Sequence, residues 1–181
     1  KPNDMSYRPQ TIAVQSIGDQ QRIWIGFAHE VIDGPTVYSE GGLKMFNSNG
    51  IFSTAWDTSW FSISNPSLLP GNDRDASVWS IVFDQIGWLW VMNEKGIRAY
   101  TLSTDYVQKS ITLHPIAQYL DGSNIDYLSS IGFSKGNRIK VDGQNNKWII
   151  THNGVWVIKE SMLFWPSEDG LNVKNSGLLS N

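Results

Sequence analysis

The same spacing of aspartate, tryptophan and glycine occurs twice in this chain. In residues 84–96 and again in residues 142–154, six positions separate the Asp from the Trp and six more separate the Trp from the Gly. A looser copy places Asp19 five positions before Trp24, and its glycine, Gly42, follows eighteen positions after that. We interpret these copies as structural repeats, whose units must stack on one another to bury their apolar faces.

The second full copy indicates what each unit folds into. Its apolar residues come in three short bursts, around Ile139, Trp148 and Trp156, and turn-forming residues at 142–146 and 152–154 separate them. Short apolar runs between clusters of Asp, Asn and Gly are typical of antiparallel hairpins. This copy is therefore predicted to form a three-stranded antiparallel meander.

The composition favours an all-β fold. Nine tryptophans and 16 glycines accompany few helix-forming runs, and these residue types suit sheet surfaces and tight turns. We predict about three four-stranded antiparallel β-propeller blades, an incomplete part of a larger propeller, within residues 1–181. The blade-like repeats are expected at about 11–63, 77–113 and 137–166.

Two segments interrupt the expected strands. Residues 29–42 are predicted to be a loop or short hairpin inserted into the first blade, and residues 114–120 a short helix or turn, which Pro115 limits. Because three blades cannot close a ring, the chain should expose two apolar blade faces. We expect it to self-associate or to belong to a larger chain.

Charge and composition exclude several kinds of partner. The formal net charge is -3 with only 14 Lys and Arg, so no cationic face for nucleic acid is expected. The chain has no cysteine, which excludes disulfides and thiolate chemistry, and no cofactor is predicted. No apolar run approaches the roughly 18 to 20 residues that span a bilayer.

The two ends of the chain each support a separate prediction. The sequence opens at Lys1 without a methionine, so we expect a processed or truncated chain. Residues 65–72 and 175–181 share the order Asn, Leu-Leu, Asn, and the first of them precedes a repeat. A further repeat is therefore expected after Asn181.

Residues 78–91, followed by Gly96-Ile97, resemble the two-component regulator propeller repeat. Such repeats build extracytoplasmic sensor regions of hybrid two-component systems, and similar ones occur in the propeller-bearing component of the Por (type IX) secretion system. Residues 139–155 are similar to the secretion variant. The resemblance covers nearly the whole chain and implies a periplasmic or cell-surface location. The departures are the insertion at 27–41, Asn-Arg at 137–138 and Ile-Thr-His at 150–152.

A few residues are candidates for chemistry. Asp142, Asn145 and Asn146 faintly resemble a calcium loop that lacks its closing Glu, so we favour a turn-capping role for the aspartate. The histidines lack the spacing of metal ligands and are interpreted as surface or loop residues: His29, His114 and His152. The loop carboxylates that could pair as acid and base are Asp73, Asp75, Glu168 and Asp169.

The tryptophans are more numerous than one per blade requires. The surplus consists of Trp56, Trp60, Trp79, Trp88, Trp156 and Trp165. We favour packing between blades as their role, and stacking against a sugar or a partner side chain as the alternative.

Two functional classes follow from these features. The favoured one is a non-enzymatic binding module of an extracytoplasmic propeller that recognises a glycan, lipopolysaccharide or protein partner in sensing or protein secretion. The alternative is a propeller-type polysaccharide lyase or glycosidase with loop carboxylates at the central channel. The first is favoured because the only recurring polar residues are turn residues. Sequence alone assigns no ligand-binding residue.

Overall fold

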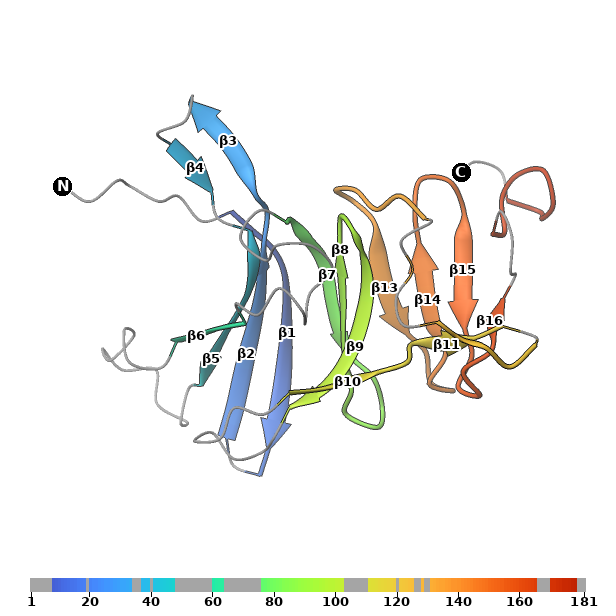
Figure 1. The fold of residues 1–181 in the computed structure, drawn as a ribbon, viewed down its shortest axis with the longest axis horizontal. Coiled ribbons are helices and arrows are strands. Elements are labelled where there is room, and N and C mark those ends of the chain that lie inside the picture. Colours follow the sequence, from blue (N-terminus) through green and yellow to red (C-terminus); the bar gives the residue numbers. More distant parts are fainter. Residues whose placement is uncertain are drawn as a thin grey trace.

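The all-β prediction is confirmed by the computed structural model, in which three four-stranded antiparallel sheets stand in a row (Figure 1). The structure describes residues 8–18, 20–33, 37–39, 41–47, 60–63, 76–102, 111–119, 121–125, 128, 131–165 and 170–178. The described residues contain no helix long and apolar enough to cross a lipid bilayer.

Each sheet, which we call a blade, is a sequential up-and-down arrangement of four strands. Blade one contains β1 (Pro9–Ile17), β2 (Gln20–Phe27), β5 (Gly42–Asn47) and β6 (Trp60–Ile63). Blade two contains β7 (Val78–Phe83), β8 (Leu89–Asn93), β9 (Gly96–Leu102) and β10 (Ile111–His114). Blade three contains β13 (Arg138–Val141), β14 (Lys147–Ile150), β15 (Val155–Ile158) and β16 (Phe164–Trp165). The meander predicted from the second repeat is confirmed as β13, β14 and β15.

The insertion in blade one is a hairpin formed by β3 (Glu30–Asp33) and β4 (Val37–Ser39). It projects from one end of the blade, away from the row of sheets (Figure 1). The fully buried Ser39 hydroxyl anchors it by accepting the Arg8 N–H (3.2 Å) and donating to the Ala28 carbonyl (2.9 Å). Of the two forms predicted for residues 29–42, a loop or a short hairpin, the structure shows the hairpin.

The helix considered for residues 114–120 is wrong. The chain there leaves β10 and forms β11 (Ala117–Gln118), which pairs with β12 (Asn124–Ile125). Ile116 and Ala117 are both fully buried, and both belong to the hydrophobic cluster between blades two and three. An extended chain can bury these adjacent residues between blades two and three and pair its backbone with β12. A helix after Pro115 would leave the backbone groups of β12 without this partner.

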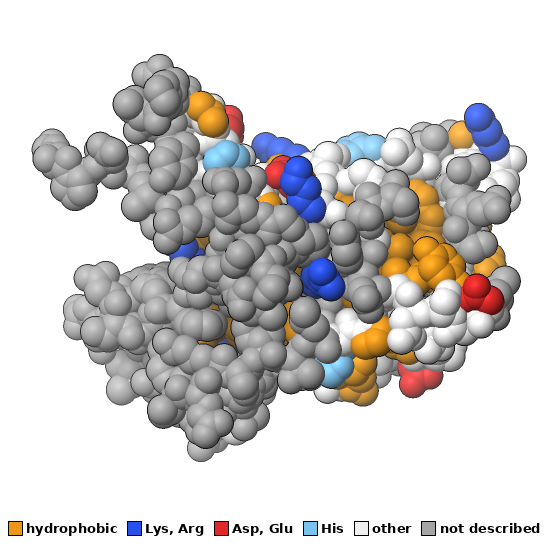
Figure 2. Space-filling model, viewed as in Figure 1, with side chains coloured by type: hydrophobic (Ala, Val, Ile, Leu, Met, Phe, Trp, Pro, Cys, Tyr) orange, Lys and Arg blue, Asp and Glu red, His pale blue; other side chains and the backbone are white. Residues whose placement is uncertain are grey.

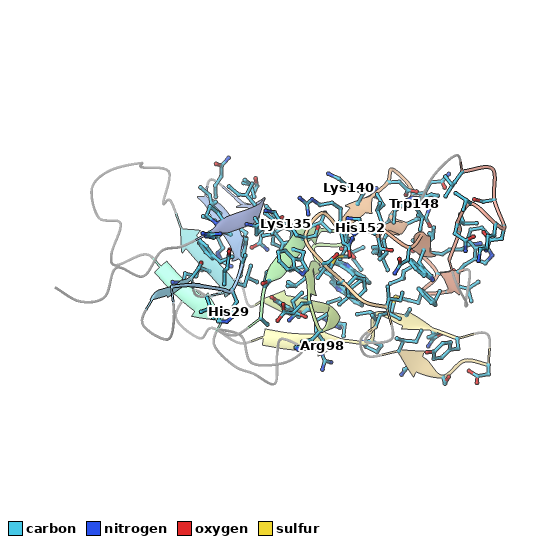
Figure 3. All side chains as sticks on the ribbon, turned by 90° about the horizontal axis from the view of Figure 1, so that it is seen from above. His29, Arg98, Lys135, Lys140, Trp148 and His152 are labelled. Atoms are coloured by element: carbon cyan, nitrogen blue, oxygen red, sulfur yellow. The ribbon has the colours of Figure 1, made fainter. Side chains whose placement is uncertain are left out.

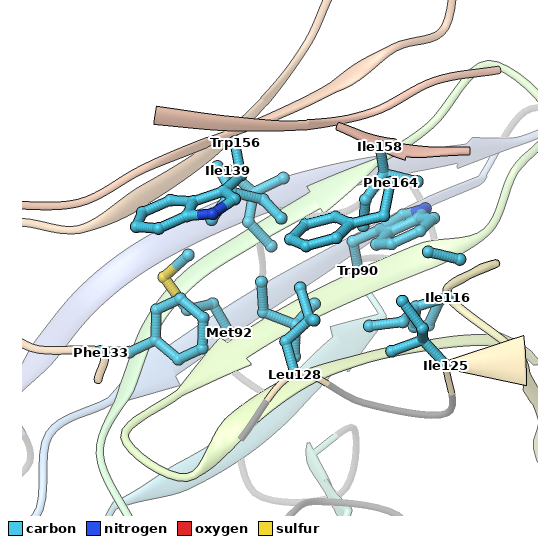
Figure 4. Packing of buried hydrophobic residues seen from close by; sticks show 14 residues of the cluster. Trp90, Met92, Ile116, Ile125, Leu128, Phe133, Ile139, Trp156, Ile158 and Phe164 are labelled. Atoms are coloured by element: carbon cyan, nitrogen blue, oxygen red, sulfur yellow. The ribbon is translucent and has the colours of Figure 1, made fainter. Parts of the chain in front are cut away.

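The core lies at the two junctions between blades. At the first junction, Trp24 of blade one packs with Ile81 and Leu89 of blade two. At the second, Trp90 and Met92 of blade two face residues of blade three, which Figure 4 shows as an interdigitated layer. The blade-three residues in this layer are Ile139, Ile149, Trp156, Ile158 and Phe164. Sheets stacked in this way bury both faces of the middle blade.

A hydroxyl also joins the first strands of neighbouring blades. The Thr11 hydroxyl accepts the Ile81 N–H (3.2 Å), and the Ser80 hydroxyl accepts the Ile139 N–H (3.0 Å). These N–H groups lie on strand edges, where they would otherwise lack a sheet partner. The hydroxyls therefore satisfy a backbone donor at each junction and hold adjacent blades in register.

Tyr100, at the first junction, provides a stability test. Its hydroxyl is buried without a hydrogen-bond partner among the described residues, and burial raises the pKa of this hydroxyl well above its usual range. Because an unsatisfied buried hydroxyl costs free energy, Tyr100→Phe should raise the free energy of unfolding by about 1 kcal/mol. Urea unfolding measures this change. Tyr119→Phe, at a side chain that is 46% exposed, is the control and should change little; a destabilised Tyr100→Phe chain would contradict the assignment.

Candidate functional site

The repeated aspartates cap the turns between the first and second strands of their blades. Asp84 Oδ1 accepts the backbone N–H groups of Ile86 (3.1 Å) and Trp88 (2.9 Å). Its Oδ2 accepts the Trp90 indole N–H at 2.9 Å. The six-residue interval of the repeat is therefore the distance along the chain that lets the turn carboxylate reach the indole in the next strand.

Asp142 repeats this geometry in blade three. Oδ1 accepts the backbone N–H groups of Gln144 and Asn146, both at 2.9 Å. Oδ2 accepts the Trp148 indole N–H (2.8 Å) and the Asn146 side-chain amide (2.9 Å). The bonds from Trp148 and Asn146 hold the pKa of the Asp142 carboxyl well below its ordinary value. Asp142 is therefore a turn cap with four donors on its two oxygens.

The looser first copy lacks this bond in the described part of the chain. Trp24 is 1% exposed, and its indole N–H has no hydrogen-bond partner among the described residues. Asp19, at the shorter interval of five, lies outside those residues.

Lys147 of blade three completes the site around Asp84. Its ammonium lies 3.4 Å from Asp84 Oδ2 and 5.1 Å from the centroid of the Trp90 ring, and both charged side chains are almost fully buried. The lysine thus provides a cation beside the Asp84 carboxylate, across the blade junction. Sequence reasoning missed Lys147, although a lysine within an otherwise apolar strand is an available signal.

The oxygens considered for a calcium loop are all engaged with N–H donors. Besides the bonds to Asp142, Asn145 Oδ1 accepts the Gln85 N–H (3.0 Å), and Asn146 Oδ1 accepts the Glu160 N–H (3.1 Å). Asn145 has a positive φ of 62°, a conformation that asparagine tolerates in tight turns. The geometry is that of an ordered turn joined to blade two.

The three histidines occupy separate places. His29 precedes the inserted hairpin, and its backbone N–H donates to the Ser77 hydroxyl (3.0 Å). His114 ends β10 and stacks on Trp88, with ring centroids 4.0 Å apart. His152 lies in the turn between β14 and β15. Among the residues that the structure describes, no three His, Asp or Glu side chains gather as a metal site would require.

The other candidates divide between the core, the surface and the undescribed segments. Asp73, Asp75, Glu168, Asp169 and Trp56 lie outside the described residues, as does the side chain of Trp60. Trp156 is buried at the second junction, and Trp79 and Trp88 pack against the same cluster. Trp165 is 43% exposed, with the Lys159 ammonium 5.8 Å from its ring centroid.

The structure brings together a polar cluster that sequence reasoning did not assemble: Ser134, Asn137 and His152. The Asn137 amide oxygen accepts the Ser134 N–H (2.8 Å), which orients the Asn137 NH₂ toward His152 Nδ1 at 2.9 Å. Nδ1 of the neutral ring is therefore an acceptor, and Nε2 carries the proton. The Ser134 hydroxyl lies 3.2 Å from the same Nδ1. This arrangement leaves the Nε2–H as a hydrogen-bond donor.

Two lysines extend this donor surface. Lys135 and Lys140 are exposed, and Figure 3 shows them in the same part of the molecule as His152. Neither lysine takes part in an ion pair among the described residues. We define Ser134, Lys135, Asn137, Lys140 and His152 as the donor patch. The departures from the repeat at 137–138 and 150–152 were its signals in the sequence, but only the fold brings these two segments together.

Comparison with known structures identifies the type of fold. No protein-family profile matches the sequence, and no curated protein matches it. The structure of PorZ, an essential bacterial surface component of the type IX secretion system of Porphyromonas gingivalis, is similar over 97% of this chain with a TM-score of 0.64 and 19% identity. The three sheets are β-propeller blades. This chain spans 22% of the PorZ chain.

Two further solved structures are less similar. A putative hydrolase from Bacteroides ovatus aligns with 86% of this chain and 42% of its own, at 12% identity and a TM-score of 0.41. The virginiamycin B lyase of Staphylococcus aureus aligns with 92% of this chain and 58% of its own, at 14% identity and a TM-score of 0.39. The resemblance to the Por secretion component is thus supported at the level of structure.

Proposed function

We propose that this chain is a non-enzymatic binding module, part of an extracytoplasmic β-propeller that recognises a glycan, lipopolysaccharide or protein partner. The structural similarity to PorZ supports a role in protein secretion at the cell surface over a role in sensing. The periplasm or cell surface is accordingly its proposed location. No nucleic acid partner is proposed, because the chain is acidic overall.

The donor patch is the observation that carries this proposal. It presents two exposed ammonium groups and the His152 Nε2–H as donors, while the Ser134 hydroxyl helps to hold the histidine ring. Hydroxyl, carboxylate and phosphate groups of surface saccharides are acceptors that match such donors. Asn137 is buried and fixes the ring of His152, so the patch is partly preorganised for binding.

A binding role is favoured over catalysis because the recurring carboxylates already serve the fold. Asp84 is held by a lysine and an indole, and Asp142 by an indole and an amide. General acid–base chemistry needs a carboxyl group that can exchange a proton with substrate. We therefore expect that converting Asp73, Asp75, Glu168 and Asp169 to their amides leaves binding unchanged, with no polysaccharide-cleaving activity to lose.

Charge reversal in the donor patch tests the binding role. The combined change Lys135→Glu and Lys140→Glu should weaken binding of purified lipopolysaccharide at least tenfold, because two attractions to anionic groups become repulsions. Biolayer interferometry at two salt concentrations measures the effect and its screening. Lys174→Glu, at an exposed lysine of the C-terminal segment, is the matched control. Equal binding by the patch variant and the control would refute this site.

A further inference from the structure

The turn between β14 and β15 differs in its hydrogen bonds from the equivalent turn of blade two. In blade two, Asn93 Oδ1 accepts the N–H groups of both Lys95 (2.8 Å) and Gly96 (3.0 Å). In blade three, the repeat spacing places Thr151 at the position of Asn93 and Gly154 at that of Gly96. The side chain that caps the turn is therefore an amide in blade two and a hydroxyl in blade three.

The hydroxyl holds only one of the two N–H groups. Thr151 Oγ1 accepts the Asn153 N–H (3.1 Å) and donates its own proton to the Gly154 carbonyl (3.1 Å). The Gly154 N–H has no hydrogen-bond acceptor among the described residues, whereas the Gly96 N–H has the Asn93 amide. No acceptor in the described fold therefore keeps the Gly154 nitrogen from reacting with a neighbouring group.

Asn153 provides a group that this nitrogen can attack. Its side chain is exposed, and its amide makes no hydrogen bond among the described residues. Because glycine has no Cβ, the Gly154 nitrogen can approach the preceding side chain without steric hindrance. The nitrogen forms a bond to Asn153 Cγ, the bond from Cγ to Nδ2 breaks, and the displaced proton leaves with the amide as ammonia. Water then opens the resulting succinimide to aspartate or isoaspartate.

The product lies beside the donor patch, because Asn153 directly follows His152. Figure 2 shows a histidine and cationic side chains along the upper edge of the molecule, over the ends of blades two and three. A new carboxylate there counteracts the attraction of Lys135 and Lys140 for anionic groups. An isoaspartate also adds a methylene to the main chain, which displaces the turn that carries His152.

We propose that Asn153 is a site of spontaneous deamidation, which proceeds through the free Gly154 N–H and weakens the donor patch. The reaction needs only water and the residues of the turn. Its effect on binding rests on the function proposed above for the donor patch. The time since folding, rather than an enzyme, thus sets the fraction of chains whose donor patch carries the added negative charge.

Peptide mass spectrometry of the full chain, incubated at neutral pH, tests the reaction. Asn153 should convert to aspartate and isoaspartate, and Asn153→Gln should not react, because its longer side chain cannot form this ring. Thr151→Asn restores the amide cap of blade two and should slow conversion about fivefold, which corresponds to one hydrogen bond of about 1 kcal/mol. In urea, wild type and Thr151→Asn should convert equally. A wild-type chain that keeps its amide, or equal rates for the two folded chains, would overturn the proposal.

Lys95→Asn provides a matched comparison within one chain. It places the same Asn-Gly pair in blade two, at the equivalent position, where the Asn93 amide holds the glycine N–H. Position 95 should therefore deamidate about fivefold more slowly than Asn153 in the same sample. Equal rates at the two positions would show that the free N–H of Gly154 is not the cause.

Binding of purified lipopolysaccharide separates failure of this proposal from failure of the proposed function. Asn153→Asp introduces the carboxylate at once and should weaken binding about threefold, as expected for one exposed charge, while Asn153→Gln should bind like wild type. If Asn153→Asp left binding unchanged but the double change Lys135→Glu and Lys140→Glu weakened it, the effect of deamidation would be wrong and the binding role would stand. If neither weakened binding, both the binding role and its loss by deamidation would be wrong.

Discussion

Replacing Lys147 with methionine is expected to lower the free energy of unfolding by about 3–5 kcal/mol, although the change is conservative in volume. The side chains of Lys147 and Asp84 are only 2% and 0% exposed, and their charged atoms lie 3.4 Å apart. Methionine retains the apolar stem but leaves the Asp84 carboxylate buried without its cation. Removing one partner of a buried ion pair costs more than the pair itself contributes.

Urea unfolding of three chains tests this expectation. Lys140→Met, on the neighbouring strand of the same blade but exposed, is the matched control and should change stability by less than about 0.5 kcal/mol. Adding Asp84→Asn to Lys147→Met should recover part of the loss, since the unpaired charge disappears. If Lys147→Met and Lys140→Met had equal effects, the junction would not depend on this ion pair.

The second large effect is expected at Trp90. Trp90→Ala should destabilise the chain by about 3–5 kcal/mol, because it leaves a cavity between two blades and frees an oxygen of Asp84. Trp148→Ala removes the same ring and the same type of hydrogen bond from a half-buried position in blade three. Its cost should be about 1–2 kcal/mol.

The two tryptophan variants are compared by urea unfolding at a protein concentration low enough to keep the chain monomeric. The ratio of the two losses in free energy of unfolding is informative. Trp90 and Trp148 are equivalent in the repeat, but only Trp90 is covered by a following blade. Equal losses would mean that packing between blades contributes little, and that the hydrogen bond to the turn aspartate dominates at both positions.

The repeat spacing predicted the fold because it reflects local geometry. An Asp that caps a turn can reach an indole six residues later only if a short strand leaves that turn, as Asp84 and Trp90 show. The antiparallel meander of blade three follows from the same spacing. Residues 114–120 were predicted less well, since their extended conformation depends on burial between blades two and three.

The candidate site could be predicted only in part. That the repeated aspartates serve turns follows from their recurrence, and His152 was noted as a loop histidine. Its contact with Asn137 and the hydroxyl of Ser134 joins residues 15 and 18 positions apart on two different loops. No periodicity marks such a pair, because the two loops meet only when β13 and β14 are paired.

The sequence by itself determined the local units of this protein: the capped turns, the strands that follow them and the tryptophan of each repeat. These depend on intervals of a few residues, which a single chain displays directly. The tertiary structure alone decided how equivalent positions differ, so that Lys147 meets a buried carboxylate while Ile12 remains open to solvent. The reason is physical: burial and charge pairing depend on which blade covers a face, and neighbouring blades are separated in sequence by about sixty residues.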